Sequence, residues 1–143
     1  MRLFPALLML TLFANAAYAE LTAVRAEQNL EKRAGKAVDH AGALMERLTK
    51  TSESADWKTT LDAVEEIAES VELADESLRA SGKNARKSPK YFKKAELRCR
   101  DILRRMDSFI QSASVDDRAP LEKARTRIQQ VHDHLLQQIM GAK

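Results

Sequence analysis

Apolar residues recur along this chain in stripes whose spacing alternates between three and four residues. The clearest stripe consists of Phe92, Ala95, Cys99, Ile102, Met106, Phe109 and Ala113. A helix with one buried face has this period, because each helical turn holds about 3.6 residues. No segment shows the sustained apolar and polar alternation of a half-buried strand, so the sequence predicts an all-α protein.

The stripes and the turn residues between them predict helices over about residues 21–50, 55–81, 89–113 and 118–141. The second stripe consists of Trp57, Leu61, Val64, Ala68, Val71 and Leu78, and the fourth of Leu121, Ala124, Ile128, Val131 and Leu135. Ser54 or Asp56 can cap the second helix, Gly82 favours its end, Ser88 can cap the third helix, and the fourth begins near Asp117. Distinct stripes in one chain, joined by short connections, predict an antiparallel up-down-up-down four-helix bundle with coiled-coil-like packing.

The first predicted helix is rich in small residues. Its stripe includes Ala23, Ala26, Ala34, Ala37 and Ala41. Gly35 and Gly42 lie beside this stripe. A glycine costs about 1 kcal/mol in a helix interior. We therefore expect a neighbouring helix to approach this face closely; a slot for a bound cofactor is the alternative interpretation.

Residues 1–19 have the pattern of a secretory signal peptide. Arg2 supplies a basic start, an apolar run follows, and Ala17 and Ala19 are small residues at the positions that a signal peptidase reads. The run is shorter than the roughly 20 apolar residues of a membrane span. We expect cleavage after Ala19, a secreted or periplasmic location, and no transmembrane segment in the mature chain of residues 20–143.

Opposite charges gather on the second and third predicted helices. The second carries the acids Glu53, Asp56, Asp62, Glu65, Glu66, Glu69, Glu72, Asp75 and Glu76. The third, with the connection before it, carries the bases Lys83, Arg86, Lys87, Lys90, Lys93, Lys94, Arg98, Arg100, Arg104 and Arg105. One interpretation is that the two helices are antiparallel neighbours that pair along their edges, which would favour one register.

The alternative is that the bases bind an anionic partner. The best candidates form a group that we call the basic patch: Lys83, Arg86, Lys87, Lys90, Lys93 and Lys94. The formal net charge of the whole chain is only +3, and the signal removes one base and no acid, so a nucleic-acid partner is not expected. Phe92 belongs to the core stripe, which leaves Tyr91 as the aromatic residue of the patch that can be exposed.

No constellation of residues points to catalysis or metal binding. His132 and His134 point about 200° apart on a helix and cannot hold one metal together, and neither they nor His40 complete a Glu-x-x-His pattern. The expected environment of the histidines is exposed or half-buried. Cys99 lies on the core stripe, and one cysteine can form neither an internal disulfide nor the c-type haem attachment.

The sequence therefore predicts an exported helical-bundle protein that acts without enzymatic activity or cofactor, as an interaction, adaptor or chaperone-like protein. Its partner is an unidentified protein or an anionic surface, and the chain itself is a monomer or a weak homo-oligomer. Two alternatives stay open. One is a bundle that carries haem, a metal or an apolar molecule; the other is binding to an anionic surface through the basic third helix.

Overall fold

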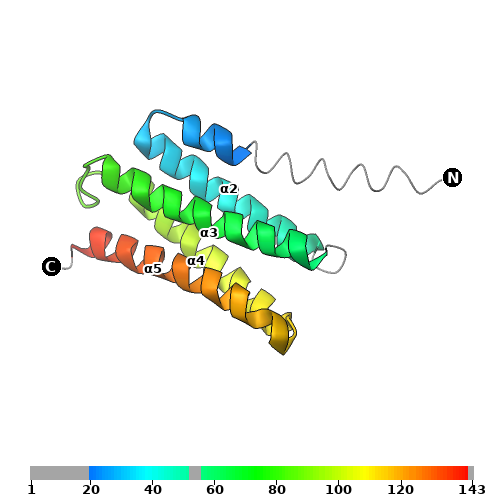
Figure 1. Cartoon of the computed structure of the whole chain (residues 1–143). Coiled ribbons are helices and arrows are strands. Elements are labelled where there is room, and N and C mark those ends of the chain that lie inside the picture. Colours follow the sequence, from blue (N-terminus) through cyan, green and yellow to red (C-terminus); the bar gives the residue numbers. More distant parts are fainter. Residues whose placement is uncertain (1–19, 52–55, 142–143) are drawn as a thin grey trace.

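The described part of the chain is all-helical. The computed structural model describes residues 20–51 and 56–141, which contain no strand and confirm the all-α prediction. The main helices are α2 (Leu30–Thr51), α3 (Trp57–Ala80), α4 (Pro89–Ser112) and α5 (Arg118–Met140), with the short 3-10 helix η1 (Val115–Asp117) before α5 (Figure 1). The expected signal peptide and the candidate cap Ser54 lie outside the described residues.

The ends of these helices follow the expected local chemistry with one exception. The Asp56 carboxylate accepts a hydrogen bond from the backbone nitrogen of Thr59 at 2.7 Å, so Asp56 caps α3. Gly82 follows the end of α3 and has a φ of +67°, a left-handed conformation that glycine adopts without strain. The expectation that Ser88 caps α4 is wrong, because its side chain makes no capping hydrogen bond.

The first predicted helix, over residues 21–50, is broken at residues 27–29. Residues 20–26 form a separate helical segment, and α2 begins only at Leu30. Asn29 causes this break locally, because its side-chain oxygen accepts a hydrogen bond from the backbone nitrogen of Lys32 at 3.0 Å. The Arg33 guanidinium also donates to the carbonyl of Glu27 at 2.7 Å.

The segment 20–26 folds back along α2 instead of extending it. Glu20 lies 3.2 Å from His40 and 3.5 Å from Arg47, both of which belong to α2. Leu21 and Val24 are buried, whereas Ala23 and Ala26, which the stripe placed in the core, are exposed. The reversal of the chain at residues 27–29 is the reason, because it turns a different face of this segment toward the protein.

Removing the Asn29 cap provides a test of this break. Asn29→Ala should lower the free energy of unfolding by about 1 kcal/mol, the usual cost of a lost N-cap, whereas Asn29→Asp should preserve most of the stability. Urea titrations followed by circular dichroism measure both variants. Equal stability of Asn29→Ala and the wild type would show that the side chain does not hold the start of α2.

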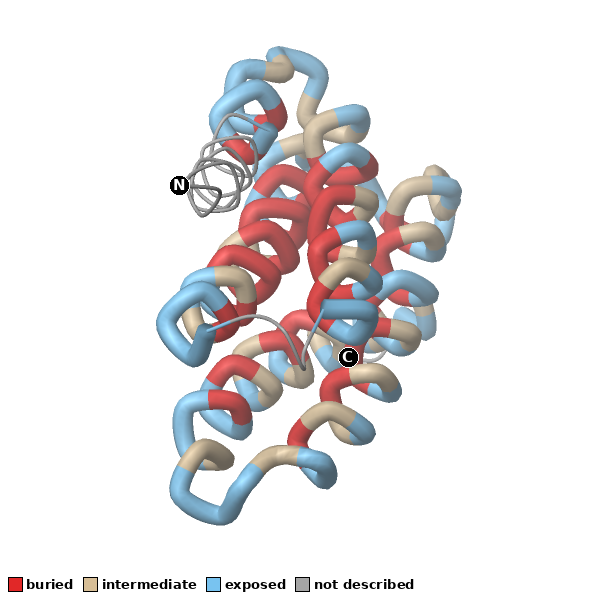
Figure 2. The backbone as a smooth tube through the Cα atoms, turned by 90° about the vertical axis from the view of Figure 1, so that its right-hand side faces the viewer, coloured by how far each residue is buried: buried red, intermediate tan, exposed pale blue. Residues whose placement is uncertain are grey.

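The four long helices share one core, and their buried residues, red in Figure 2, lie on the faces that the helices turn toward one another. Its largest fully buried side chains include Met45, Ile67, Ile102, Met106 and Leu135. Ile102, Met106 and Leu135 belong to the predicted stripes, and Met45 and Ile67 lie directly beside them, so the stripes identify the core well. Trp57, which was expected at the start of the second stripe, is instead 38% exposed.

The helices are arranged as two hairpins, α2 with α3 and α4 with α5, that pack side by side. The contacts join α2 to α4 and α3 to α5, while α3 and α4 touch each other far less than any of these pairs. Asp39 on α2 binds Lys94 and Arg98 on α4, and Thr49 lies beside Phe109 further along both helices. Residue numbers thus rise together, so α2 and α4 run in the same direction.

This arrangement corrects the expected pairing of the acidic and basic helices. Among the described residues, no ion pair joins α3 to α4, because these two helices lie at diagonal corners. The acids of α3 instead meet Arg127 of α5, whose guanidinium lies 2.7 Å from both Glu65 and Glu72. Opposite charge on consecutive helices therefore does not make them neighbours here.

None of the described helices combines the length and apolar character needed to cross a membrane.

Candidate functional site

The basic patch lies at the end of the molecule where α3 finishes and α4 begins. Asn84 shapes the connection, because its side-chain oxygen accepts hydrogen bonds from the backbone nitrogens of Arg86 and Lys87 at 2.9 and 3.3 Å. The side chain of Ala85 is buried and closes the core below this turn. The turn holds Arg86 and Lys87 in solvent at the tip of the molecule.

The structure divides the basic patch into two groups. Lys83 lies 2.5 Å from Glu31, and Lys94 lies 2.7 Å from Asp39, so acids of α2 hold these two lysines. Arg86, Lys87, Lys90 and Lys93 are exposed, and none forms an ion pair with a carboxylate within residues 20–51 and 56–141. These four side chains, which we call the unpaired cations, are the part of the patch that can meet an outside anion.

The parallel course of α2 and α4 strengthens the positive potential at this end. Both helices begin here, and a helix N-terminus carries roughly half a positive charge from its unsatisfied N–H groups. Tyr91 is half-buried against α2, where a Cβ on Gly35 would lie 3.3 Å from its ring. The expected close approach to the small face of α2 is therefore confirmed at Gly35.

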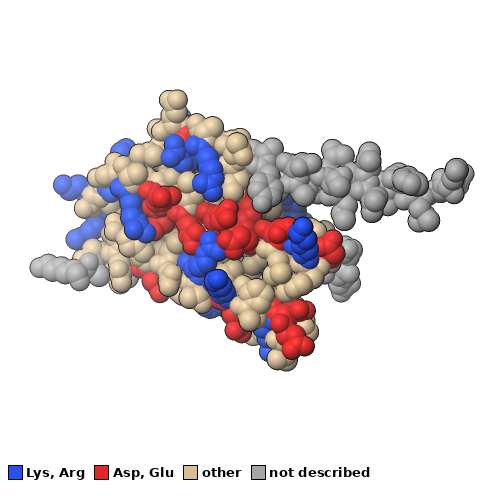
Figure 3. Space-filling model, viewed as in Figure 1, with Lys and Arg blue, Asp and Glu red and all other residues tan. Residues whose placement is uncertain are grey.

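Lys90 extends beside this aromatic residue. Its ammonium lies 5.3 Å from the centroid of the Tyr91 ring, within the range of a cation–π contact. The space-filling view shows acids gathered over the middle of the α3 face and bases at the end where α4 begins (Figure 3). Acidic and basic side chains thus concentrate on different parts of this surface.

Each of the three histidines pairs with a buried carboxylate from another helix. His40 lies 3.2 Å from Glu66, His132 lies 3.0 Å from Glu96, and His134 lies 2.7 Å from Asp75. His132 and His134 thus point to α4 and α3 respectively, as their spacing predicts. The expectation that the histidines are exposed or half-buried is wrong for His40, which is 6% exposed.

The sequence interpretation missed the acidic partners, although a signal was present. The second stripe has a gap between Val71 and Leu78, and Asp75 occupies the helical position that would fill it. Asp75 is 3% exposed and also binds Arg79. An acid at a stripe position indicates a buried carboxylate that needs partners from a neighbouring helix.

Cys99 is fully buried, as the stripe predicts. Burial, with smaller contributions from the carboxylates of Asp75 and Glu96, raises the pKa of the thiol to about 12. The nucleophilic form of cysteine is the thiolate. The thiol therefore stays protonated at neutral pH and is shielded from reagents.

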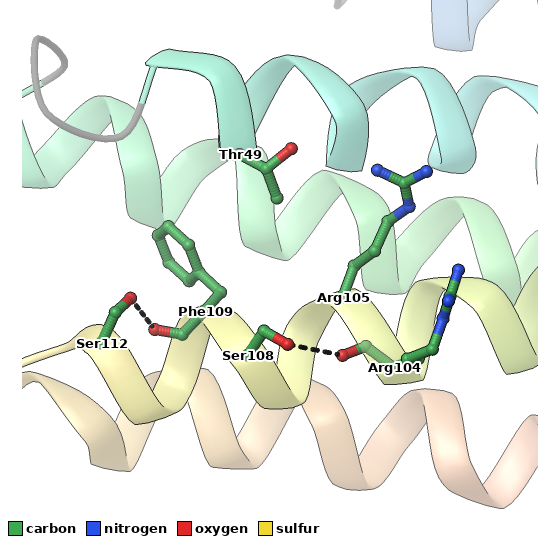
Figure 4. A pocket seen from close by; sticks show the side chains of 6 residues that line it. All are labelled: Thr49, Arg104, Arg105, Ser108, Phe109 and Ser112. Atoms are coloured by element: carbon green, nitrogen blue, oxygen red, sulfur yellow. Dashed lines mark hydrogen bonds between the residues drawn. The ribbon is translucent and has the colours of Figure 1, made fainter.

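A groove of about 530 Å³ lies between the C-terminal parts of α2 and α4 (Figure 4). Arg105 extends toward α2, but its guanidinium binds Asp101 at 3.0 Å, and Arg104 binds the same carboxylate. The Thr49, Ser108 and Ser112 hydroxyls donate to carbonyls of their own helices. The lining groups are thus engaged with one another and do not converge on a common point.

Groups that could bind a metal do not cluster either. Within the described ranges, no set of three or more histidine, cysteine or acidic side chains has suitable geometry. Met45 and Met106 are fully buried among apolar residues, and Met140 is 73% exposed. Unpaired positive charge is therefore the distinctive property of the candidate site.

These observations define an all-α protein whose candidate site is a group of exposed, unpaired basic side chains rather than a ligand-binding cavity. Comparison with known proteins finds no matching family model, no matching curated protein and no matching solved structure.

Proposed function

We propose that this chain is an exported, non-enzymatic interaction protein that binds an anionic membrane surface through the unpaired cations Arg86, Lys87, Lys90 and Lys93. In this proposal the signal peptide is removed after Ala19, and residues 20–143 form an antiparallel up-down-up-down four-helix bundle. The observation that carries the proposal is that exposed bases without acidic partners concentrate at the end where two helices begin.

The chemistry of the site favours a flat anionic surface. The unpaired cations project from a turn and from the first turns of α4, and none of them lines the groove between α2 and α4. Basic residues near an anionic lipid surface each contribute about 1 kcal/mol of attraction. A signal peptide would place the protein next to a membrane, where this attraction operates.

Charge reversal at the site tests this function. The double variant Lys87→Glu, Lys90→Glu should bind vesicles of anionic lipid about 30-fold more weakly or worse, since two bases are lost and two acids gained. Co-sedimentation with vesicles containing anionic lipid, compared with purely zwitterionic vesicles, measures the effect. Binding of the wild type should also fall as salt rises, because exposed charges are screened.

A matched control is available at the opposite end of the molecule. Lys58 and Lys123 are exposed and form no ion pair with a described carboxylate, so Lys58→Glu, Lys123→Glu changes the net charge equally. This control should retain most of the vesicle binding. If both variants lost vesicle binding equally, net charge alone would explain the loss. That result would contradict a specific site at the unpaired cations. Binding to an acidic soluble protein with none to vesicles would also overturn the membrane proposal.

No contact between described residues favours the alternative function, a bundle that carries haem, a metal or an apolar molecule. The small face of α2 is filled by neighbouring side chains, with Ala34, Ala37 and Ala41 fully buried. An absorption spectrum and metal analysis of the freshly purified protein test this alternative directly.

A further inference from the structure

The outer faces of α3 and α4 carry stripes of opposite charge. The acidic stripe on α3 consists of Asp62, Glu65, Glu69, Glu72 and Glu76. The basic stripe on α4 consists of Lys90, Lys93, Arg100 and Arg104, with Leu97 in the middle. Both follow the same alternating steps of three and four residues, so each forms one straight row along its helix.

Because α3 and α4 are diagonal, the two stripes face away from each other and cannot meet within one molecule. α4 passes behind α3 in Figure 1, and the acids gather on the near face in Figure 3. The side chain of Leu97, whose residue is 56% exposed, lies in the middle of the basic stripe. The charge complementarity visible in the sequence is thus left largely unused by the fold.

Local ion pairs neutralise each stripe only in part. Arg127 is shared by Glu65 and Glu72, and Arg25 lies 3.9 Å from Glu69. Asp62 and Glu76 form no ion pair with a described base, just as Lys90 and Lys93 form none with a described acid. On the basic stripe, Arg100 binds Glu96 and Arg104 binds Asp101, so its net positive charge comes from Lys90 and Lys93. The acidic stripe keeps a net negative charge.

We infer that the partner of the basic stripe is the acidic stripe of a second copy of this chain. The contact is heterologous, since it joins α4 of one molecule to α3 of the next. It leaves an acidic stripe open on one molecule and a basic stripe open on the other, so further copies can add head to tail. Exposed ion pairs are individually weak and salt-sensitive, so the association is reversible and favoured by low salt.

Two variants with reversed stripes test this inference. Lys90→Glu, Lys93→Glu alters only the basic stripe, and Asp62→Lys, Glu76→Lys alters only the acidic stripe; neither removes an ion pair between described residues. Sedimentation velocity at roughly millimolar protein and low salt should show wild-type species larger than a dimer, which dissociate near 1 M salt, where the screening length is about 3 Å. Each variant alone should remain monomeric.

Mixing the two variants gives the decisive result. The intact basic stripe of one should bind the intact acidic stripe of the other, so the mixture should contain complexes that neither variant forms alone. A monomeric mixture, a monomeric wild type at low salt, or a variant that still self-associates alone would overturn the inference. Circular dichroism checks that each variant keeps the wild-type helical content.

Charge-matched controls separate the stripes from net charge. Lys32→Glu, Lys123→Glu and Asp116→Lys, Glu122→Lys change exposed residues outside both stripes by the same amounts, and both variants should self-associate like the wild type. Asp62→Lys, Glu76→Lys leaves the unpaired cations intact. It should therefore lose self-association while retaining vesicle binding, so the failure of one proposal is distinguishable from the failure of the other.

Discussion

Replacing Ile67 with alanine should lower the free energy of unfolding by about 2–4 kcal/mol. Ile67 is 0% exposed in the middle of α3, a helix that packs against both α2 and α5. The substitution removes apolar contact and leaves a cavity, because closely packed helices relax only in part around the missing atoms. Urea unfolding followed by circular dichroism gives the change in free energy.

Leu97→Ala is the matched control for this experiment. It also shortens an aliphatic side chain on a helix, but the residue is 56% exposed, so its cost should stay within about 0.5 kcal/mol. If both substitutions cost the same, the burial of Ile67 would not be the source of its contribution.

The stability of the protein should fall at alkaline pH because of Cys99. The pKa of its thiol is raised to about 12 in the folded state, whereas an unfolded chain ionises near the ordinary value of about 8.5. Above that value the unfolded state releases its proton first, so the stabilising contribution is complete below about pH 8.5 and is lost as pH rises toward the folded value. Between pH 7.5 and 10.5 the loss should be about 3 kcal/mol.

The Cys99→Ala variant isolates this contribution from the titration of lysines and tyrosines. It lacks the thiol, so its stability should fall less with pH, and the gap between wild type and variant should change by about 3 kcal/mol. Urea titrations of both proteins at the two pH values, under reducing conditions, measure the gap. A constant gap would contradict the shielding of the thiol that the structure shows.

The helices were predictable because their information is local. The stripe from Phe92 to Met106 identifies the buried face of α4, and the capping chemistry of Asp56 and Gly82 identifies the ends of α3. The break at residues 27–29 was missed because alanine and other helix formers surround it. A single Asn29 cap, supported by the folded-back contacts of residues 20–26, outweighs this propensity.

The sequence predicts which basic residues form the candidate site, but not which of them have an acidic partner. The sequence identifies the basic patch, since it depends only on clustered lysines and arginines. Which of these bases are neutralised depends on Glu31 and Asp39, which are more than 50 residues earlier in the chain. The same limit applies to the histidines, whose carboxylate partners come from other helices.

The amino-acid sequence is enough to identify the buried face of each long helix and most of the helix ends, because the spacing of apolar residues and the caps act within a few turns. Which helices are neighbours is visible in the folded structure alone. All the stripes are apolar, so their pattern does not distinguish one partner helix from another. The small face of α2 accepts both α3 and α4, and the eight residues between Ala80 and Pro89 can span a diagonal that is only about 14 Å. The fold therefore places the acidic and basic helices apart, and their charges remain on the outer surface.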